Sequence, residues 1–329
     1  MNNLNRKEFL GVGALTFFSL LTPEITFGMP QAVGKKIGII GLDTSHSVAF
    51  AKAINADSAK YKGYHVAMAY PYGSKTIASS FERIPKYIEE IKTYGVEIAE
   101  SIQDLLTKVD AVMLETNDGR LHLAQAEEVL KAKKIFFIDK PLAASYKDAA
   151  AIFDLAKKYD VPFFSSSSLR YITGMAEVLS GKYGKVLGAD VYSPASLESS
   201  HPDFFWYGIH GVEILFTAMG IGCKTISRTH TADADTIVGV WEDGRIGTVR
   251  GTRKGKAEFG GTIFCEKGAV KLGEFVGYNP LLDQIVNFFD TRKVPFDPRE
   301  TLEICAFIQA ADVSKVRNGQ AVELKSITQ

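Results

Sequence analysis

The feature that most constrains the fold is a regular alternation of short apolar runs with amphipathic stretches in the first half of the chain. Apolar runs at residues 36–41, 65–70, 111–115, 134–139 and 161–167 alternate with stretches of helical periodicity, including residues 45–55, 84–95, 123–132 and 146–159. Runs that are apolar almost throughout are typical of parallel strands buried on both faces. The alternation predicts a doubly wound, Rossmann-like α/β domain over residues 35–168.

The pattern changes after Arg170. Longer strand-like segments at residues 185–193, 225–232, 235–252 and 260–272 contain hairpin turns at residues 241–245 and 266–268. This favours a second α/β domain with an open antiparallel sheet over residues 169–329. Two helices are expected at residues 280–291 and 298–319, the second capped by Asp297, and we expect them to pack back toward the first domain.

Charge and cysteine content exclude several classes of function. The 38 basic residues equal the 38 acidic ones, so no net field attracts the protein to nucleic acid or to an anionic membrane. The balanced charge favours a small-molecule substrate over nucleic acid or a membrane as the partner of this protein. The 3 cysteines are far apart, with no CxxC pair, and are expected to be buried thiols. His65, His201 and His230 have no ligand spacing, so no metal site is predicted.

Residues 1–32 are predicted to be an export signal. Arg6 and Lys7 precede an apolar run at residues 11–21 that is too short for a mature membrane helix. The pattern resembles a twin-arginine signal with one arginine changed to lysine, a type that exports folded proteins. A Sec signal or an uncleaved anchor is the alternative. We therefore expect a periplasmic protein without stable membrane insertion once the signal is removed.

The segment Gly38 to Ser47 has the form of a dinucleotide-binding turn, but only its first glycine is present. Gly41, Asp43 and His46 occupy the positions of the three expected glycines. We expect Asp43 to turn away and cap the helix, while Thr44, Ser45 and His46 offer amides, hydroxyls and an imidazolium to a pyrophosphate. Alternatively, Asp43 and His46 only cap and pack a fold that no longer binds nucleotide.

The second strand ends without the carboxylate that usually binds the adenosine ribose. Instead Tyr70 is followed, within five residues, by Ser74 and Lys75, whose donors would tolerate a 2′-phosphate. NADP is therefore as reasonable a cofactor as NAD. The segment could also be a simple turn.

Several motifs together resemble one family. They are Thr116-Asn117, His122, Asp139-Lys140-Pro141, Gly208-Ile209-His210 and the terminal Ala310-Ala311 with Ser314. The first three lie at or just after strand ends predicted to meet at the carboxyl edge of the sheet, where such folds bind ligands. In this pattern the chain resembles the glucose-fructose oxidoreductase / inositol dehydrogenase / rhizopine-catabolism (Gfo/Idh/MocA) oxidoreductases.

The resemblance implies roles for individual residues. It places Thr116, Asn117 and His122 with the cofactor, Lys140 between nicotinamide and substrate, and His210 on the substrate hydroxyl. These roles suit hydride removal from an alcohol, which needs a base for the hydroxyl proton and a cation to steady the alkoxide.

The substrate side of the site departs from the family pattern. In the family, an aspartate often lies four residues before the histidine that corresponds to His210, but Trp206 occupies that position here. Glu213, three residues after His210 on the same helical face, could take the role of the missing aspartate. Trp206 and Tyr207 would suit stacking on a sugar, or they are core residues. His201 shares their loop, and Arg170 would bind substrate or tie the two domains together.

These expectations define an NAD(P)-dependent oxidoreductase acting on a sugar, cyclitol or glycoside, with NAD or NADP as cofactor. The family often pairs through its open sheet, so a homo-oligomer is expected. A redox-neutral lyase or glycosidase that uses bound NAD is one alternative. A non-catalytic binding protein on a degenerate dinucleotide-binding fold is the other.

Overall fold

The computed structural model describes residues 35–329, so the predicted export signal lies outside the described residues. The first half contains a parallel sheet of six strands in the order β3-β2-β1-β4-β5-β6. The strands are β1 (Lys36–Ile40), β2 (His65–Tyr70), β3 (Glu97–Ile98), β4 (Ala111–Leu114), β5 (Ile135–Asp139) and β6 (Phe163–Ser166). The strand order reverses between β1 and β4, which is the point where open α/β sheets bind ligands.

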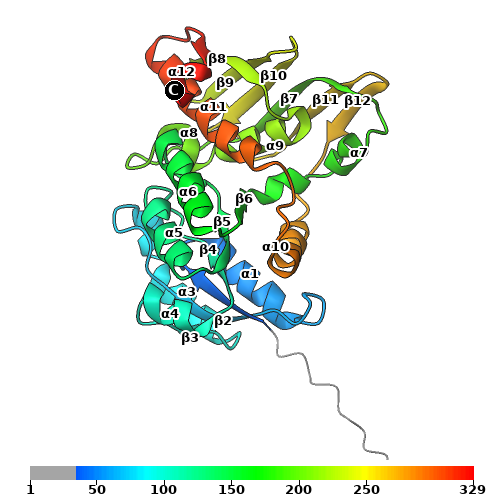
Figure 1. The fold of residues 1–329 in the computed structure, drawn as a ribbon. Coiled ribbons are helices and arrows are strands. Elements are labelled where there is room, and N and C mark those ends of the chain that lie inside the picture. The colour runs from blue at the N-terminus through cyan, green and yellow to red at the C-terminus, as the bar shows by residue number, and fades with distance from the viewer. Residues whose placement is uncertain (1–34) are drawn as a thin grey trace, which may run out of the picture. The chain divides into compact units, whose positions relative to one another are not determined.

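Helices cover both faces of this first sheet (Figure 1). They are α1 (Ser45–Ala56), α2 (Ala78–Phe81), α3 (Ile84–Lys92), α4 (Ile102–Lys108), α5 (His122–Lys131) and α6 (Tyr146–Tyr159). The central strands are buried because both of their faces meet helices; Val112 and Met113, neighbours on β4, lie in separate apolar clusters. The predicted Rossmann-like architecture is confirmed.

The second half contains a sheet of seven strands in the order β12-β11-β7-β10-β9-β8-β13. The strands are β7 (Val186–Pro194), β8 (Cys223–His230), β9 (Ala234–Trp241), β10 (Ile246–Thr252), β11 (Gly260–Cys265), β12 (Gly268–Leu272) and β13 (Val322–Glu323). The predicted antiparallel hairpins β9–β10 and β11–β12 are present. However, β7 and β10 pair in parallel, so the sheet is mixed. The chain leaves β7, forms two helices and the β8–β9 hairpin, and returns in the same direction.

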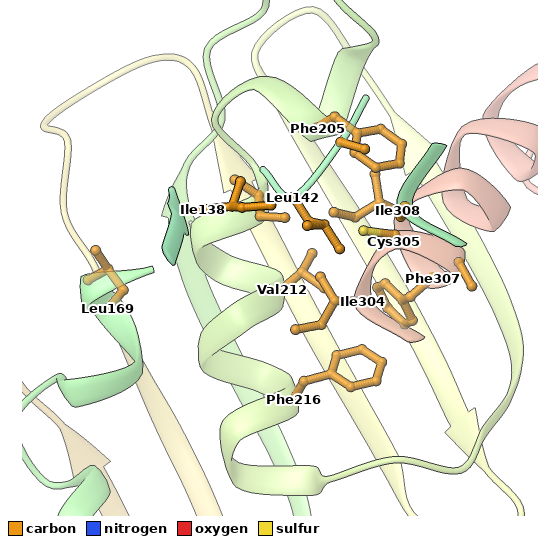
Figure 2. Packing of buried hydrophobic residues seen from close by; sticks show 14 of the residues in the cluster. Ile138, Leu142, Leu169, Phe205, Val212, Phe216, Ile304, Cys305, Phe307 and Ile308 are labelled. Carbon is orange, nitrogen blue, oxygen red and sulfur yellow. The ribbon is translucent and has the colours of Figure 1, made fainter. Parts of the chain in front are cut away.

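Helices α9 (Ile209–Met219) and α11 (Pro298–Val316) pack on the second sheet. Figure 2 shows Val212 and Phe216 of α9 beside Ile304 and Phe307 of α11. Cys305 lies in the same core, and all three cysteines are buried free thiols, as predicted. The expected cap of α11 is also present, because the Asp297 side chain accepts from the Arg299 amide.

The C-terminal helices divide between the two halves. Helix α10 (Asn279–Thr291) packs beside α1 and places Ile285 and Phe288 in the apolar cluster of the first sheet. Helix α11 packs on β8 and also contacts α6. The remaining short elements, not predicted individually, are η1 (Ser168–Tyr171), α7 (Met175–Leu179), α8 (Asp203–Trp206) and α12 (Lys325–Thr328). Within residues 35–329, no helix has the length and apolar character needed to cross a membrane.

Candidate active site

The turn between β1 and α1 keeps the geometry that the first glycine requires. Gly41 has a φ of 96°, a conformation that side chains with a Cβ rarely adopt. A Cβ there would lie 2.6 Å from the backbone nitrogen of Thr116, so the turn also passes too close to β4 for any other residue. Ser47 stabilises the turn by donating a hydrogen bond to the Gly41 carbonyl, 2.8 Å away.

Asp43 does not cap α1, which corrects the sequence-based expectation. Its buried carboxylate accepts hydrogen bonds from the backbone amides of Ser74 and Asn117, both at 2.9 Å. Thr44 is the cap instead, its hydroxyl accepting from the His46 amide. Burial raises the pKa of Asp43, although the two amides oppose the shift. Asp43 therefore ties the segments that follow β2 and β4 to the turn after β1.

Three predicted cofactor residues are engaged within the protein. The Ser74 hydroxyl donates to Asp118 at 2.9 Å, and the Asn117 amide group donates to Ser80 at 3.0 Å. His122 is fully buried, with Nε2 2.6 Å from the Thr116 carbonyl and Nδ1 3.2 Å from that of Leu142.

The side chains of Ser74, Asn117 and His122 thus hold the loops together, and their assignment as cofactor ligands stays a prediction. Thr116 differs from them, since its hydroxyl is buried without a hydrogen-bond partner. Tyr70 is half-buried, with its ring against Tyr72.

His46 contacts β5 instead of extending toward a ligand at the helix N-terminus. Its Nδ1 lies 2.8 Å from Oδ2 of Asp139, and its ring packs on Phe50 and Tyr278. The expectation that His46 donates to a phosphate then concerns its other ring nitrogen, Nε2, and stays a prediction. Ser45 is the exposed residue of the first turn.

Two acids and a lysine lie at the ends of β4 and β5. Glu115 and Asp139 are fully buried, and Lys140 Nζ is 3.7 Å from Asp139 Oδ2. Burial raises the pKa of Glu115 well above its ordinary value, and the charge of Asp139 adds to the shift. Burial acts on Asp139 too, but His46 and Lys140 outweigh it and lower its pKa. Two buried acids whose pKa values are shifted in opposite directions therefore lie close together at this edge of the sheet.

His210 joins this group from the second half of the chain. It lies in the first turn of α9, is 4% exposed, and its Nδ1 is 2.7 Å from the Ser167 hydroxyl. Burial lowers the pKa of His210 well below its ordinary value, and the charges of Lys140 and His46 lower it further. The imidazole is therefore neutral at neutral pH and can accept a proton.

Arg170 and Glu213 connect structural elements and do not orient His210. Arg170 Nε is 3.0 Å from Glu213, its guanidinium also pairs with Glu300, and it stacks on the ring of Phe296. Arg170 thus joins η1 to α9 and α11, and both roles expected for it, binding substrate or tying the two domains together, stay predictions. The expectation that Glu213 replaces the missing aspartate is wrong, because its carboxylate is bonded to Arg170 and Ser166.

The predicted substrate residues divide into two groups. The Tyr207 ring lies 4.9 Å from that of His210, so it borders the candidate base. The His201 ring centroid lies 5.3 Å from that of Trp206, and His201 Nε2 lies 4.0 Å from Oδ1 of Asp118. His201 is therefore on the side of the loops that follow β2 and β4. Trp206 and Tyr207 are both partly exposed and can contact a ligand.

Sequence reasoning missed Glu115, Ser167 and Tyr278 as members of this site. An acid that directly follows an apolar strand was a usable signal for Glu115. Ser167 stood in a run of four serines that did not distinguish it, and nothing near Tyr278 indicated that α10 would bring it to His46.

Comparison with known proteins identifies the first half of the chain. Residues 35–167 match the model of the Gfo/Idh/MocA oxidoreductase family, described as having an NAD-binding Rossmann fold. These residues therefore form an NAD-binding Rossmann domain of the kind found in that oxidoreductase family. The resemblance and the cofactor class expected from the sequence are confirmed. A search of curated proteins finds no match.

Solved structures extend the likeness over both halves. A scyllo-inositol dehydrogenase from Lactobacillus casei, with bound NAD(H) and scyllo-inositol, is 16% identical with a TM-score of 0.70, covering 88% of this chain and 99% of its own. An oxidoreductase from Agrobacterium radiobacter, with NAD⁺, L-tartaric acid and magnesium, is 16% identical with a TM-score of 0.68, covering 89% and 99%. GenD2 from gentamicin A biosynthesis, with NAD, is 14% identical with a TM-score of 0.70, covering 88% and 96%. At these identities the likeness establishes the shared fold.

The residues present fit a dinucleotide at several points. The Gly41 turn and the exposed start of α1 are intact, and the Thr116 hydroxyl beside them is unpaired. A hollow of about 300 Å³, with mostly apolar walls, lies beyond β2 and is lined partly by Tyr72, Lys75 and Phe81. Asp43 is the departure, since it takes two amides that would otherwise face the ligand.

Proposed function

We propose that the protein is an NAD(P)-dependent oxidoreductase that transfers a hydride to or from the carbon of a sugar, cyclitol or glycoside hydroxyl. The observation that carries this proposal is the buried group formed by Lys140 and His210. They come from separate halves of the chain and are both buried; burial lowers the pKa of His210, and the charge of Lys140 adds to the shift. A neutral base and a cation facing one hydroxyl are the groups that alcohol oxidation requires.

The chain's own residues have complementary roles. His210 accepts the hydroxyl proton on Nε2 when Nδ1 carries its proton and donates to the Ser167 hydroxyl, which also fixes the ring. The Lys140 ammonium steadies the developing alkoxide. Tyr207, at 4.9 Å from His210, packs on the apolar face of the substrate ring. When bound, the cofactor supplies the nicotinamide that exchanges the hydride.

The cofactor would be held by the start of α1, where Thr44 and Ser45 offer hydroxyls and backbone amides favour a pyrophosphate. Its adenosine end would occupy the hollow beyond β2, where exposed Lys75 accommodates a 2′-phosphate and no acid repels it. The protein is therefore proposed to accept NAD or NADP.

Replacing Lys140 tests this function. We expect Lys140→Ala to lower turnover by a factor of about 100 or more, because a positioned charge or proton donor contributes that much. Nicotinamide absorbance at 340 nm would be followed with a panel of cyclitols, sugars and glycosides, using Lys147→Ala, an exposed lysine on α6, as the matched control. A Lys140→Ala enzyme as active as the parent would remove Lys140 from the mechanism.

The same assay separates the two alternatives. A substrate consumed with no net change in nicotinamide absorbance, yet only in the presence of cofactor, would indicate a redox-neutral lyase or glycosidase. A ligand that binds the protein unchanged, with no cofactor affinity, would indicate a binding protein. The side chains of Ser74 and Asn117 donate hydrogen bonds within the protein, which favours this last alternative over a cofactor-binding role for them.

Two further proposals concern the protein's setting. The basic residues and apolar run in residues 1–32 support export to the periplasm, and a mature N-terminus at Met1 in the cytoplasmic fraction would contradict it.

Exposed Leu187, Tyr192, Ile246 and Phe264 on strands of the second sheet support a homo-oligomer formed through that sheet. Sedimentation of a monomer at micromolar concentration would contradict this proposal.

A further inference from the structure

We propose that His46, Glu115 and Asp139 bind a divalent transition-metal cation at the carboxyl edge of the first sheet. The residues come from α1, from the end of β4 and from β5. None of them belongs to the pair of residues to which the proposed reaction is assigned. The inference stands on these side chains and does not depend on the proposed function.

The geometry meets the first requirement of a metal site. One donor atom from each residue lies within 4.8 Å of the other two. Nitrogen and carboxylate donors bind Zn²⁺ at about 2.0–2.2 Å, so donors around one ion lie roughly 3–4 Å apart. Small side-chain adjustments therefore bring the three donors around a common centre. Three protein ligands leave at least one coordination position open for water.

The two oxygens of Glu115 are the observation that points to a ligand. Glu115 is 0% exposed, and neither oxygen has a hydrogen-bond partner; Oδ1 of Asp139 also has none. Other acids at this edge are satisfied, because Asp43 accepts from two amides and Asp118 from Arg120 and Ser74. A buried carboxylate left without partners costs several kcal/mol, and a bound cation would remove that cost.

The charges facing the group leave room for a cation. Lys140 Nζ lies 3.7 Å from Oδ2 of Asp139 and makes no hydrogen bond to Glu115, while His46, itself a proposed ligand, has its Nδ1 2.8 Å from the same oxygen. Asp43 adds a third acid to the surroundings of Glu115. His210 from α9 adds no positive charge, because burial lowers its pKa well below its ordinary value, and Tyr278 packs on the His46 ring. Lys140 therefore offsets only part of the negative charge.

The donor set indicates which cations would bind. One imidazole nitrogen with two carboxylates suits Zn²⁺ or Mn²⁺, whereas Ca²⁺ prefers six to eight oxygen ligands. The only member with any exposed surface is His46, at 8%, which places the opening beside the first turn of α1.

The test uses the full chain without a polyhistidine tag, stripped with EDTA and then titrated with ZnCl₂ against a chromophoric chelator. We expect one Zn²⁺ per chain in the parent. Glu115→Gln, which keeps the shape of the protonated acid, should weaken binding by at least about 10-fold, since even outer-shell partners of a metal contribute 10–100-fold. Mn²⁺ should compete with Zn²⁺, and Ca²⁺ should not.

Asp118→Asn is the matched control, because Asp118 is a buried acid three residues from Glu115 that lies outside the group. Thermal unfolding of the variants, with and without Zn²⁺, reports whether each one is folded. The proposal is supported if Zn²⁺ raises the Tm of the parent and of Asp118→Asn but not of Glu115→Gln. It is overturned if the parent takes up no Zn²⁺, or if folded Glu115→Gln binds it as tightly, because a proton or a buried water then satisfies Glu115.

Discussion

At the scale of single residues, Asp43 shows how one side chain changes a dinucleotide-binding turn. Where the usual motif has glycine, this chain has a carboxylate that accepts from the amides of Ser74 and Asn117. Gly73 is fixed by this contact, since a Cβ there would lie 2.1 Å from the Asp43 carboxylate. The turn is thus stabilised from within, by an anion that belongs to the protein.

Replacing Asp43 should therefore lower stability. Asp43→Ala leaves the Ser74 and Asn117 amides buried without an acceptor, at about 1–3 kcal/mol for each unsatisfied group. We expect the free energy of unfolding, measured by urea denaturation, to fall by about 2–6 kcal/mol. Asp233→Ala removes an acid that is 64% exposed, and should change it by less than about 0.5 kcal/mol. Equal stability in the two variants would contradict the proposed role of Asp43.

Residue-level reasoning from sequence succeeded where a position is fixed by backbone geometry. Gly41 and the Asp297 cap follow from local rules, and both are found as expected. The hydrogen-bond partners of the Asp43, His46 and Glu213 side chains were not predicted. Their partners lie 31–93 positions away in the chain, so the choice among acceptors depends on tertiary structure.

At the scale of elements, the strands and helices of the first sheet follow directly from their apolar periodicity. The second sheet was harder to predict, because alternating strands carry no signal for the direction of their neighbours. The parallel pairing of β7 with β10 depends on where the chain returns after α9 and the β8–β9 hairpin. Short elements such as β3, with two residues, have too little pattern to be recognised.

A buried ion-pair cluster links η1 to α9 and α11. Arg170 pairs with Glu213 and Glu300, and all three side chains are largely buried. Arg170→Met should lower the free energy of unfolding by about 3–5 kcal/mol, because it leaves two buried acids without their cation.

Chemical denaturation of Arg170→Met beside Arg299→Ala provides the comparison. Arg299 pairs with Asp297 at the surface, with 74% of its side chain exposed, and such solvent-screened pairs contribute little to stability. If the two variants lose the same stability, the cluster does not join these elements.

At the scale of the whole molecule, the candidate site exists because elements from both halves of the chain come together. β5 supplies Asp139 with Lys140 after it, α9 supplies His210, and α10 brings Tyr278 beside His46. Each motif was visible in the sequence, but their meeting depends on helices that pack across both halves. A formal net charge of zero gives no long-range attraction to a charged partner, which suits a small polar substrate.

Binding of the cofactor tests the central claim most directly. Isothermal titration of the full chain with NADH and with NADPH should show one site per chain for at least one of them. The Kd should fall between about 1 μM and 1 mM, the range of enzyme KM values. The absence of binding by both dinucleotides up to millimolar concentration, in protein shown to be folded, would contradict the account of this chain as a nicotinamide-dependent oxidoreductase.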